Sequence, residues 1–199
     1  MELTELQQLV DLSIEDCQQI INQNPKVILS EGDFEKLLSE CISKRIGYVK
    51  EKTTPDSFAV YTQISHYNDD TDKNDARVDI LLMKPDNIVR VLNKNKDFYF
   101  KSNESIAIEL KYQHAKNEEC VKKVNEDIDK VKKYYNDSYY YVIALLDENE
   151  DTEKYKNDIL KYYESKKKEY EKNNNYKDKF FCCILTKKEF KFKEYEVLE

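Results

Sequence analysis

Residues 105–112 read SIAIELKY, and this stretch decides how the core of the chain is interpreted. The strongly apolar side chains recur at every second position, which is the period of a β-strand: Ile106, Ile108 and Leu110. Glu109 and Lys111 are also two positions apart, so both leave the opposite face of that strand. We therefore expect a strand that packs one apolar row under a helix and carries two opposite charges on its other face.

Apolar residues at helical spacing predict four helices along the chain. The first covers 3–24, with Ser13 as an N-cap where its apolar stripe restarts. The second runs from Ser30 to about Gly47. Ser30 is a good cap residue with an acid three positions later, and glycine commonly ends a helix. The other two helices are predicted over 117–135 and 151–172.

Segments of alternating or continuous apolar character predict the strands. The first begins at Phe58, and the polar stretch 66–75 is expected to be a loop. The segment 139–146 is apolar throughout, which is typical of a strand in the centre of a sheet. The strands are predicted at 58–65, 77–83, 105–112, 139–146 and 180–185, with additional short strands at 98–100 and 190–198.

Strands that alternate with helices at this spacing predict an α/β fold, with a mixed central β-sheet flanked by helices. A length of 199 residues is that of one domain. Within this single domain we expect an N-terminal helical extension at 1–29 and a core at 30–146. The remaining residues, 147–199, would add a helix and a strand that complete the sheet.

The composition limits the classes of protein to which the chain can belong. Hydrophobic residues make up 40% and charged residues 37%, which allows a core and argues against general disorder. There is no apolar run of about 18 residues, so no membrane span is expected. Five cysteines without a CxxC pair favour a reducing, cytoplasmic location. The net charge of −7 gives no general support for a nucleic-acid partner, although basic groups can still converge on one face.

Charged residues occur inside two of the apolar strands. Asp79 lies within RVDILLM at 77–83, and Glu109 and Lys111 lie within the strand quoted above. Burying an unpaired charge is costly, so these groups need partners. If the two strands are neighbours, two carboxylates and one ammonium group converge. Paired carboxylates suit Mg²⁺ (or Mn²⁺), which keeps several waters and also binds substrate phosphate. The backbone carbonyl of Leu110 would add a ligand.

This pattern resembles the PD-(D/E)xK nuclease superfamily, whose restriction-endonuclease-like core has the element order αβββαβ. The resemblance rests on Asp79 in one strand and Glu109-Leu110-Lys111 in the next, followed by a helix and an apolar strand. It covers roughly residues 30–146, and Val78 replaces the proline of the motif. It implies Mg²⁺-dependent hydrolysis of phosphodiester bonds, and our leading hypothesis is a nuclease that acts on DNA. Asp79 and Glu109 would be metal ligands, and Lys111 would activate water or stabilise the attacked phosphate.

Members of this superfamily also place a glutamate of the first core helix near the metal. Glu31 and Glu35 can both lean toward the sheet, whereas Glu40 falls on the far side of the helix. We choose Glu31 as the catalytic helix carboxylate, with Glu35 as the alternative.

Alternatives to a nuclease remain open at this point. The same three charges can form a structural ion pair in a nuclease-like domain that binds nucleic acid or protein without turnover. The tyrosine-rich segment 151–172 can equally belong to a protein-interaction domain. The sequence does not distinguish DNA from RNA, and a homodimer is expected only if both strands of a duplex are cut. His114 is interpreted as a solvated loop residue.

Overall fold

The computed structural model describes residues 1–54, 57–68, 73–90, 98–100, 104–114, 116–130, 138–172 and 179–188. Within them, seven strands form one sheet in the order β3-β4-β1-β2-β5-β6-β7. The neighbours β1, β2 and β5 are antiparallel, whereas β5, β6 and β7 are parallel. The strands are β1 Ala59–Asn68, β2 Lys73–Met83, β3 Ile88–Arg90, β4 Phe98–Phe100, β5 Ile106–Tyr112, β6 Tyr139–Asp147 and β7 Phe180–Lys187.

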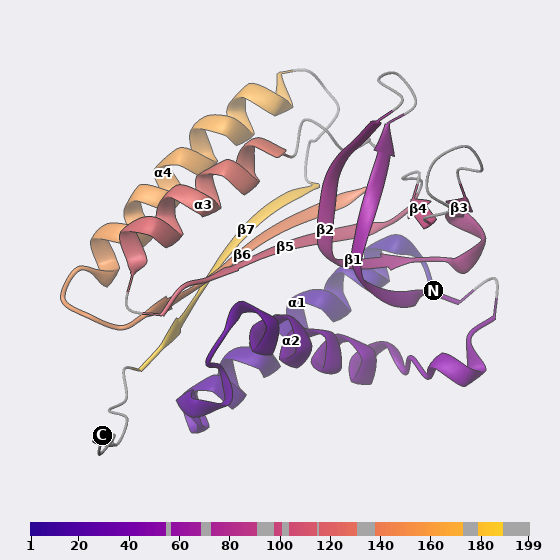
Figure 1. Cartoon of the computed structure of the whole chain (residues 1–199), viewed down its shortest axis with the longest axis horizontal. Coiled ribbons are helices and arrows are strands. Elements are labelled where there is room, and N and C mark those ends of the chain that lie inside the picture. Colours follow the sequence, from indigo (N-terminus) through magenta and orange to yellow (C-terminus); the bar gives the residue numbers. More distant parts are fainter. Residues whose placement is uncertain are drawn as a thin grey trace, which may run out of the picture.

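Two pairs of long helices enclose this sheet (Figure 1). On one face lie α1 (Leu3–Gln23) and α2 (Glu31–Ile46), and on the other lie α3 (Asn117–Lys130) and α4 (Thr152–Glu171). The segment from α2 to β6 contains the order α2-β1-β2-β5-α3-β6, with the short β3 and β4 inserted before β5. The predicted α/β fold with a mixed sheet is confirmed.

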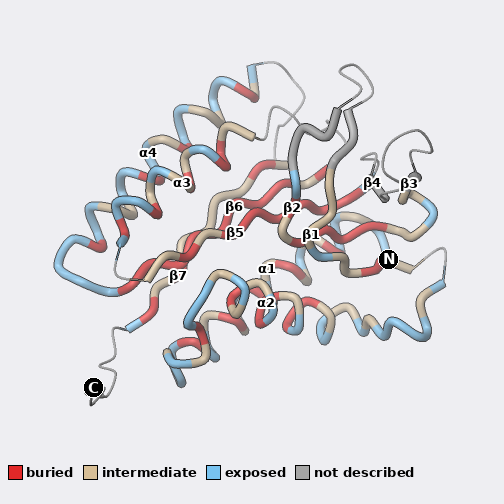
Figure 2. Tube along the Cα trace, in the orientation of Figure 1, coloured by how far each residue is buried: buried red, intermediate tan, exposed pale blue. Residues whose placement is uncertain are grey.

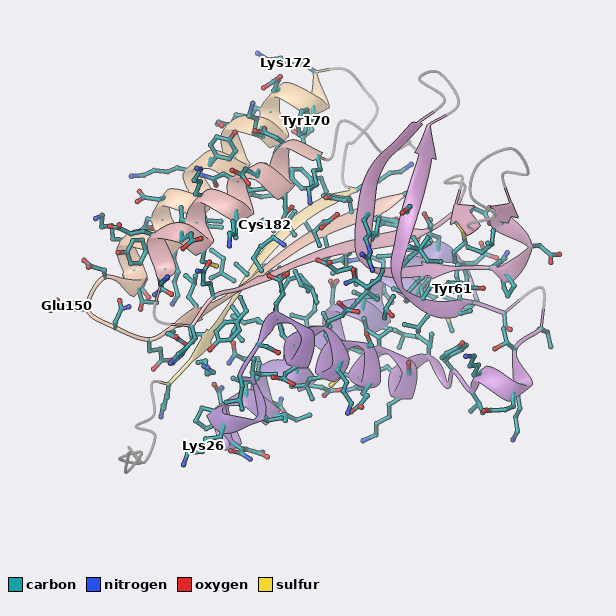
Figure 3. The ribbon with its side chains drawn as sticks, in the orientation of Figure 1. Lys26, Tyr61, Glu150, Tyr170, Lys172 and Cys182 are labelled. Carbon is teal, nitrogen blue, oxygen red and sulfur yellow. The ribbon has the colours of Figure 1, made fainter. Side chains whose placement is uncertain are left out.

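Each face of the sheet has its own hydrophobic core, and the buried residues concentrate in the central strands (Figure 2). The alternating row of β5 packs against α1 and α2, as predicted, while Ala107 faces α3 and α4. In the second core, Tyr170 of α4 and Cys182 of β7 pack in the same cluster (Figure 3). Because both faces of β6 are covered, its continuous apolar sequence is explained.

The ends of α2 are those that the sequence predicts. The Oγ of Ser30 accepts a hydrogen bond from the backbone N–H of Asp33 at 3.2 Å, and the Asp33 carboxylate accepts one from the N–H of Leu29 at 3.1 Å. Gly47 ends the helix with φ of 66°, the left-handed conformation that glycine adopts most readily. The start of α2 is therefore fixed, and with it the position of Glu31 in the first turn.

Some predictions at the level of single elements were wrong. Ser13 is not an N-cap, because it lies inside α1 and its hydroxyl donates to the carbonyl of Leu9 at 2.6 Å. The stretch 66–75 is not a loop throughout, since β1 continues to Asn68 and β2 begins at Lys73. Backbone pairing extends the hairpin beyond its apolar residues. The strand β3 was not predicted. The predictions for 131–135 and 190–198 lie outside the described residues.

None of the helices in the described residues is long and apolar enough to cross a membrane.

Candidate active site

A local break in the β1–β2 pair creates the candidate site. In β2, Val78 packs on the α3–α4 side, whereas Ile80 packs on the α1–α2 side, although residues two apart normally share a face. The alternation of β2 is therefore inverted at Asp79. Thr62 pairs with Ile80 and Ile64 pairs with Val78, so Gln63 stands opposite Asp79. Gln63 has a positive φ of 57°, which is uncommon for a residue with a side chain.

This break turns the Asp79 carboxylate into the plane of the sheet, toward β5. The β2–β5 pairing covers 80–82 and 106–108, and in an uninterrupted ladder Leu110 would then stand opposite Val78. Instead, Oδ2 of Asp79 accepts the N–H of Leu110 at 2.7 Å. The other oxygen, Oδ1, accepts from the side-chain amide of Gln63 at 3.2 Å. The carboxylate thus sits where the two strands separate.

Glu109 and Lys111 lie beside this point on the α3 side of β5, as their spacing predicts. Glu109 is 1% exposed, and Lys130 of α3 lies 3.4 Å from its Oε2. The Nζ of Lys111 lies 3.3 Å from Oδ2 of Asp127, also on α3. The structure therefore brings Asp79, Glu109 and Lys111 to one end of the β2–β5 pair.

Both candidate glutamates of α2 reach the site, but they have different partners. Glu31 lies 3.4 Å from Nζ of Lys111 and accepts the N–H of Tyr112 at 3.3 Å. Glu35, one turn later, accepts a hydrogen bond from the same Gln63 amide nitrogen that holds Asp79. Burial raises the pKa of Glu35, and repulsion from Asp79 and Glu31 adds to this effect. Glu40 is exposed, as expected for the far side of the helix.

Sequence reasoning missed Asp127, which connects the two lysines of the site. It is 1% exposed and forms ion pairs with both Lys111 and Lys130. Burial raises the pKa of Asp127, while the two lysines oppose this shift. The available signal was an acidic residue on the apolar stripe of α3, between Val124 and Ile128, where a solvated acid is not expected.

The surrounding carboxylates determine the charge of Lys111. Burial alone would lower its pKa, but attraction to Asp127, Glu31, Asp79 and Glu109 outweighs burial, so the pKa is raised. Lys111 is therefore an ammonium group at neutral pH in this arrangement. Such a group can stabilise negative charge or orient a water molecule. It can act as a base only after it loses a proton, which neutralisation of the nearby carboxylates would make easier.

The donor set fits Mg²⁺ in its charge and in its chemistry. Carboxylates outnumber basic side chains here, five to three: Glu31, Glu35, Asp79, Glu109 and Asp127 against Lys111, Lys130 and Arg77. The N–H and C=O of one strand residue point to the same side, so the Leu110 carbonyl lies on the Asp79 side. In the described part of the chain, no group of three or more acidic, histidine or cysteine side chains is arranged to hold a metal by itself. Mg²⁺ needs only one or two protein carboxylates, completed by carbonyl, water and phosphate oxygens.

A second polar network lies at the carboxyl ends of β5, β6 and β7. Lys187 is completely buried, with Nζ 3.1 Å from the carbonyl of Ile28 and 3.4 Å from Asp147, and it also contacts the hydroxyl of Tyr112. His114 is not simply a solvated loop residue, because its Nδ1 lies 2.8 Å from the buried Asp147 carboxylate. Because Ile28 lies two residues before Ser30, the cap of α2, this network anchors the start of the helix that carries Glu31 and Glu35.

Comparison of the chain with protein-family models, with curated proteins and with solved structures found no match. The functional interpretation therefore depends on the geometry of the site.

Proposed function

We propose that this protein is a Mg²⁺-dependent deoxyribonuclease that hydrolyses phosphodiester bonds. One observation carries the proposal. The Asp79 carboxylate lies where β2 and β5 separate, and it accepts a hydrogen bond from the backbone N–H of Leu110, the residue between Glu109 and Lys111. A structural ion pair between strands does not require a carboxylate turned into the plane of the sheet. A site that holds a cation and a phosphate between two separating strands does require an oxygen ligand in the plane of the sheet.

Each residue then has a specific role. Asp79, Glu109 and the Leu110 carbonyl would hold Mg²⁺ (or Mn²⁺). When bound, this ion lowers the pKa of a coordinated water and neutralises charge on the phosphate. The Lys111 ammonium would stabilise the negative charge that develops on the attacked phosphate. Glu31 positions Lys111 through their 3.4 Å contact.

The proposal is tested by incubating the purified protein with duplex and single-stranded DNA, with Mg²⁺ or Mn²⁺, and with EDTA as the metal-free control. We expect metal-dependent cleavage that Asp79→Ala, Glu109→Ala and Lys111→Ala each abolish. Glu40→Ala is a matched control, because Glu40 is an exposed carboxylate on the same helix as Glu31. Cleavage that survives in all three site variants would contradict the proposal. The same assay with RNA would test the choice of DNA as the substrate. The mass of the protein in solution would show whether it is a homodimer, as expected if both strands of a duplex are cut.

A second candidate is a nuclease-like module that binds nucleic acid or protein without turnover. It is favoured by the ion pairs already present, since Lys130 contacts Glu109 and Lys111 contacts both Glu31 and Asp127. This candidate predicts binding that does not depend on divalent metal. Calorimetric titration of the protein with Mn²⁺, in the absence of nucleic acid, separates the two candidates.

A further inference from the structure

Two cysteines that are far apart in the sequence meet where α1 packs on α2. Cys17 of α1 is completely buried and Cys41 of α2 is 7% exposed, and both belong to the core between these helices and the sheet. Beside them, Arg45 of α2 pairs with Asp16 of α1 at 2.6 Å, and a hydrogen bond between the two thiols is the largest influence on the pKa of each. The two cysteines therefore lie in the same contact between α1 and α2.

Cys41 also lines a cavity at the surface. The cavity lies between α1 and α2 and has a volume of about 700 Å³. Its wall includes Asp16, Ile20, Glu40, Lys44 and Arg45. Cys41 therefore borders a cavity that is open to solvent, whereas Cys17 is completely buried and does not line it.

The environment gives the two thiols different reactivities. The hydrogen bond from Cys17 lowers the pKa of Cys41, although burial and the nearby Asp16 and Glu40 oppose this effect. The same hydrogen bond, together with burial, raises the pKa of Cys17. The thiolate is the reactive form of cysteine, and Cys41 is the thiol that borders the cavity, so Cys41 is the nucleophile and Cys17 the thiol that resolves the product.

We propose that Cys17 and Cys41 form a redox-active dithiol that hydrogen peroxide converts into a disulfide joining α1 to α2. The Cys41 thiolate attacks the O–O bond, forms an S–O bond and releases hydroxide. The Cys17 sulfur then attacks the Cys41 sulfur, loses its proton and displaces the second hydroxide. Two thiols and one peroxide thus give one disulfide and two waters, with two electrons passing from sulfur to oxygen. This proposal is independent of the proposed nuclease activity.

The experiment uses the reduced full-length protein, treated with hydrogen peroxide under native conditions, quenched and mapped by peptide mass spectrometry. We expect a Cys17–Cys41 cross-linked peptide, with the other three cysteines still open to alkylation. The matched control is Cys120→Ser, since Cys120 is buried and burial raises its pKa to about 12. This variant should form the same cross-link.

Two further measurements test which cysteine reacts first and whether the disulfide stabilises the fold. In Cys17→Ser, dimedone should label Cys41 as the sulfenic acid, whereas in Cys41→Ser no label should appear at Cys17. The oxidised wild-type protein should also unfold at a higher urea concentration than the reduced protein, because a cross-link restricts the unfolded chain. Absence of the cross-linked peptide, or oxidation of Cys120 and Cys182 at the rate of Cys41, would overturn the proposal. The wild-type peptide map decides this even if a serine variant does not fold.

Discussion

Replacing Lys187 by methionine tests the idea that a buried ion pair fixes the site. Methionine keeps most of the side-chain volume but removes the ammonium group from Asp147, which is 3% exposed, and from the Ile28 carbonyl. Removing one partner of a buried ion pair typically costs about 3–5 kcal/mol, because the remaining buried charge loses its ionic partner. Asp147 keeps its contact with His114 at 2.8 Å, so we expect a loss at the lower end of this range. A domain is usually stable by about 5–15 kcal/mol, so a large part of the free energy of unfolding would be lost.

The assay is urea unfolding followed by far-UV circular dichroism, with Lys188→Met as the matched control. Lys188 is the next residue and is exposed, so its replacement should change the free energy of unfolding by less than about 0.5 kcal/mol. The double variant Lys187→Met with Asp147→Asn should recover part of the loss, because both charges are then absent. A loss below about 1 kcal/mol for Lys187→Met would refute the reasoning, since that value is typical of surface ion pairs.

Other substitutions test single contacts of the site. Ser30→Ala should lower the free energy of unfolding by about 1 kcal/mol through loss of the α2 cap, measured by urea unfolding. Gln63→Leu should cost about 1–3 kcal/mol, because Glu35 and Asp79 lose their shared donor; an unchanged unfolding midpoint would contradict this. Glu35→Gln should stabilise the protein at pH 7. Folding raises the pKa of Glu35, so its carboxyl group stabilises the folded state fully at a pH below its ordinary pKa of 4.5. This stabilisation is lost as the pH rises through the pKa that Glu35 has in the folded protein. The gain should therefore disappear in unfolding curves recorded below about pH 4, and a gain that is the same at both pH values would contradict this assignment.

Much of the fold follows from local sequence patterns. The ends of α2 depend on Ser30 and Gly47, whose roles are set by backbone chemistry within a few residues. The faces of β5 follow from strand geometry alone, so its apolar row and its two charges are assigned correctly. Ser13 misled the interpretation because a serine inside a helix can bond to the preceding turn instead of capping a new helix.

The parts of the site that the sequence did not predict depend on contacts between distant segments. The inversion at Asp79 requires the unusual backbone of Gln63 on the neighbouring strand, and no local pattern encodes it. Lys187 lies in an apolar strand, but its partners come from β5, β6 and the segment before α2. Asp127 carried a readable signal, an acid on an apolar helix face, which sequence reasoning did not use. Glu31 and Glu35 both reach the site because consecutive turns of α2 pass over neighbouring parts of the sheet, where Glu31 contacts Lys111 of β5 and Glu35 contacts Gln63 of β1.

The most direct test of the proposed metal site is a crystal structure of the protein grown with Mn²⁺, using the anomalous signal of the ion. We predict a peak about 2.0–2.3 Å from oxygens of Asp79 and Glu109 and from the Leu110 carbonyl, with Lys130 displaced from Glu109. Well-ordered crystals in which Glu109 still pairs with Lys130, and in which no peak lies beside Asp79, would contradict the account.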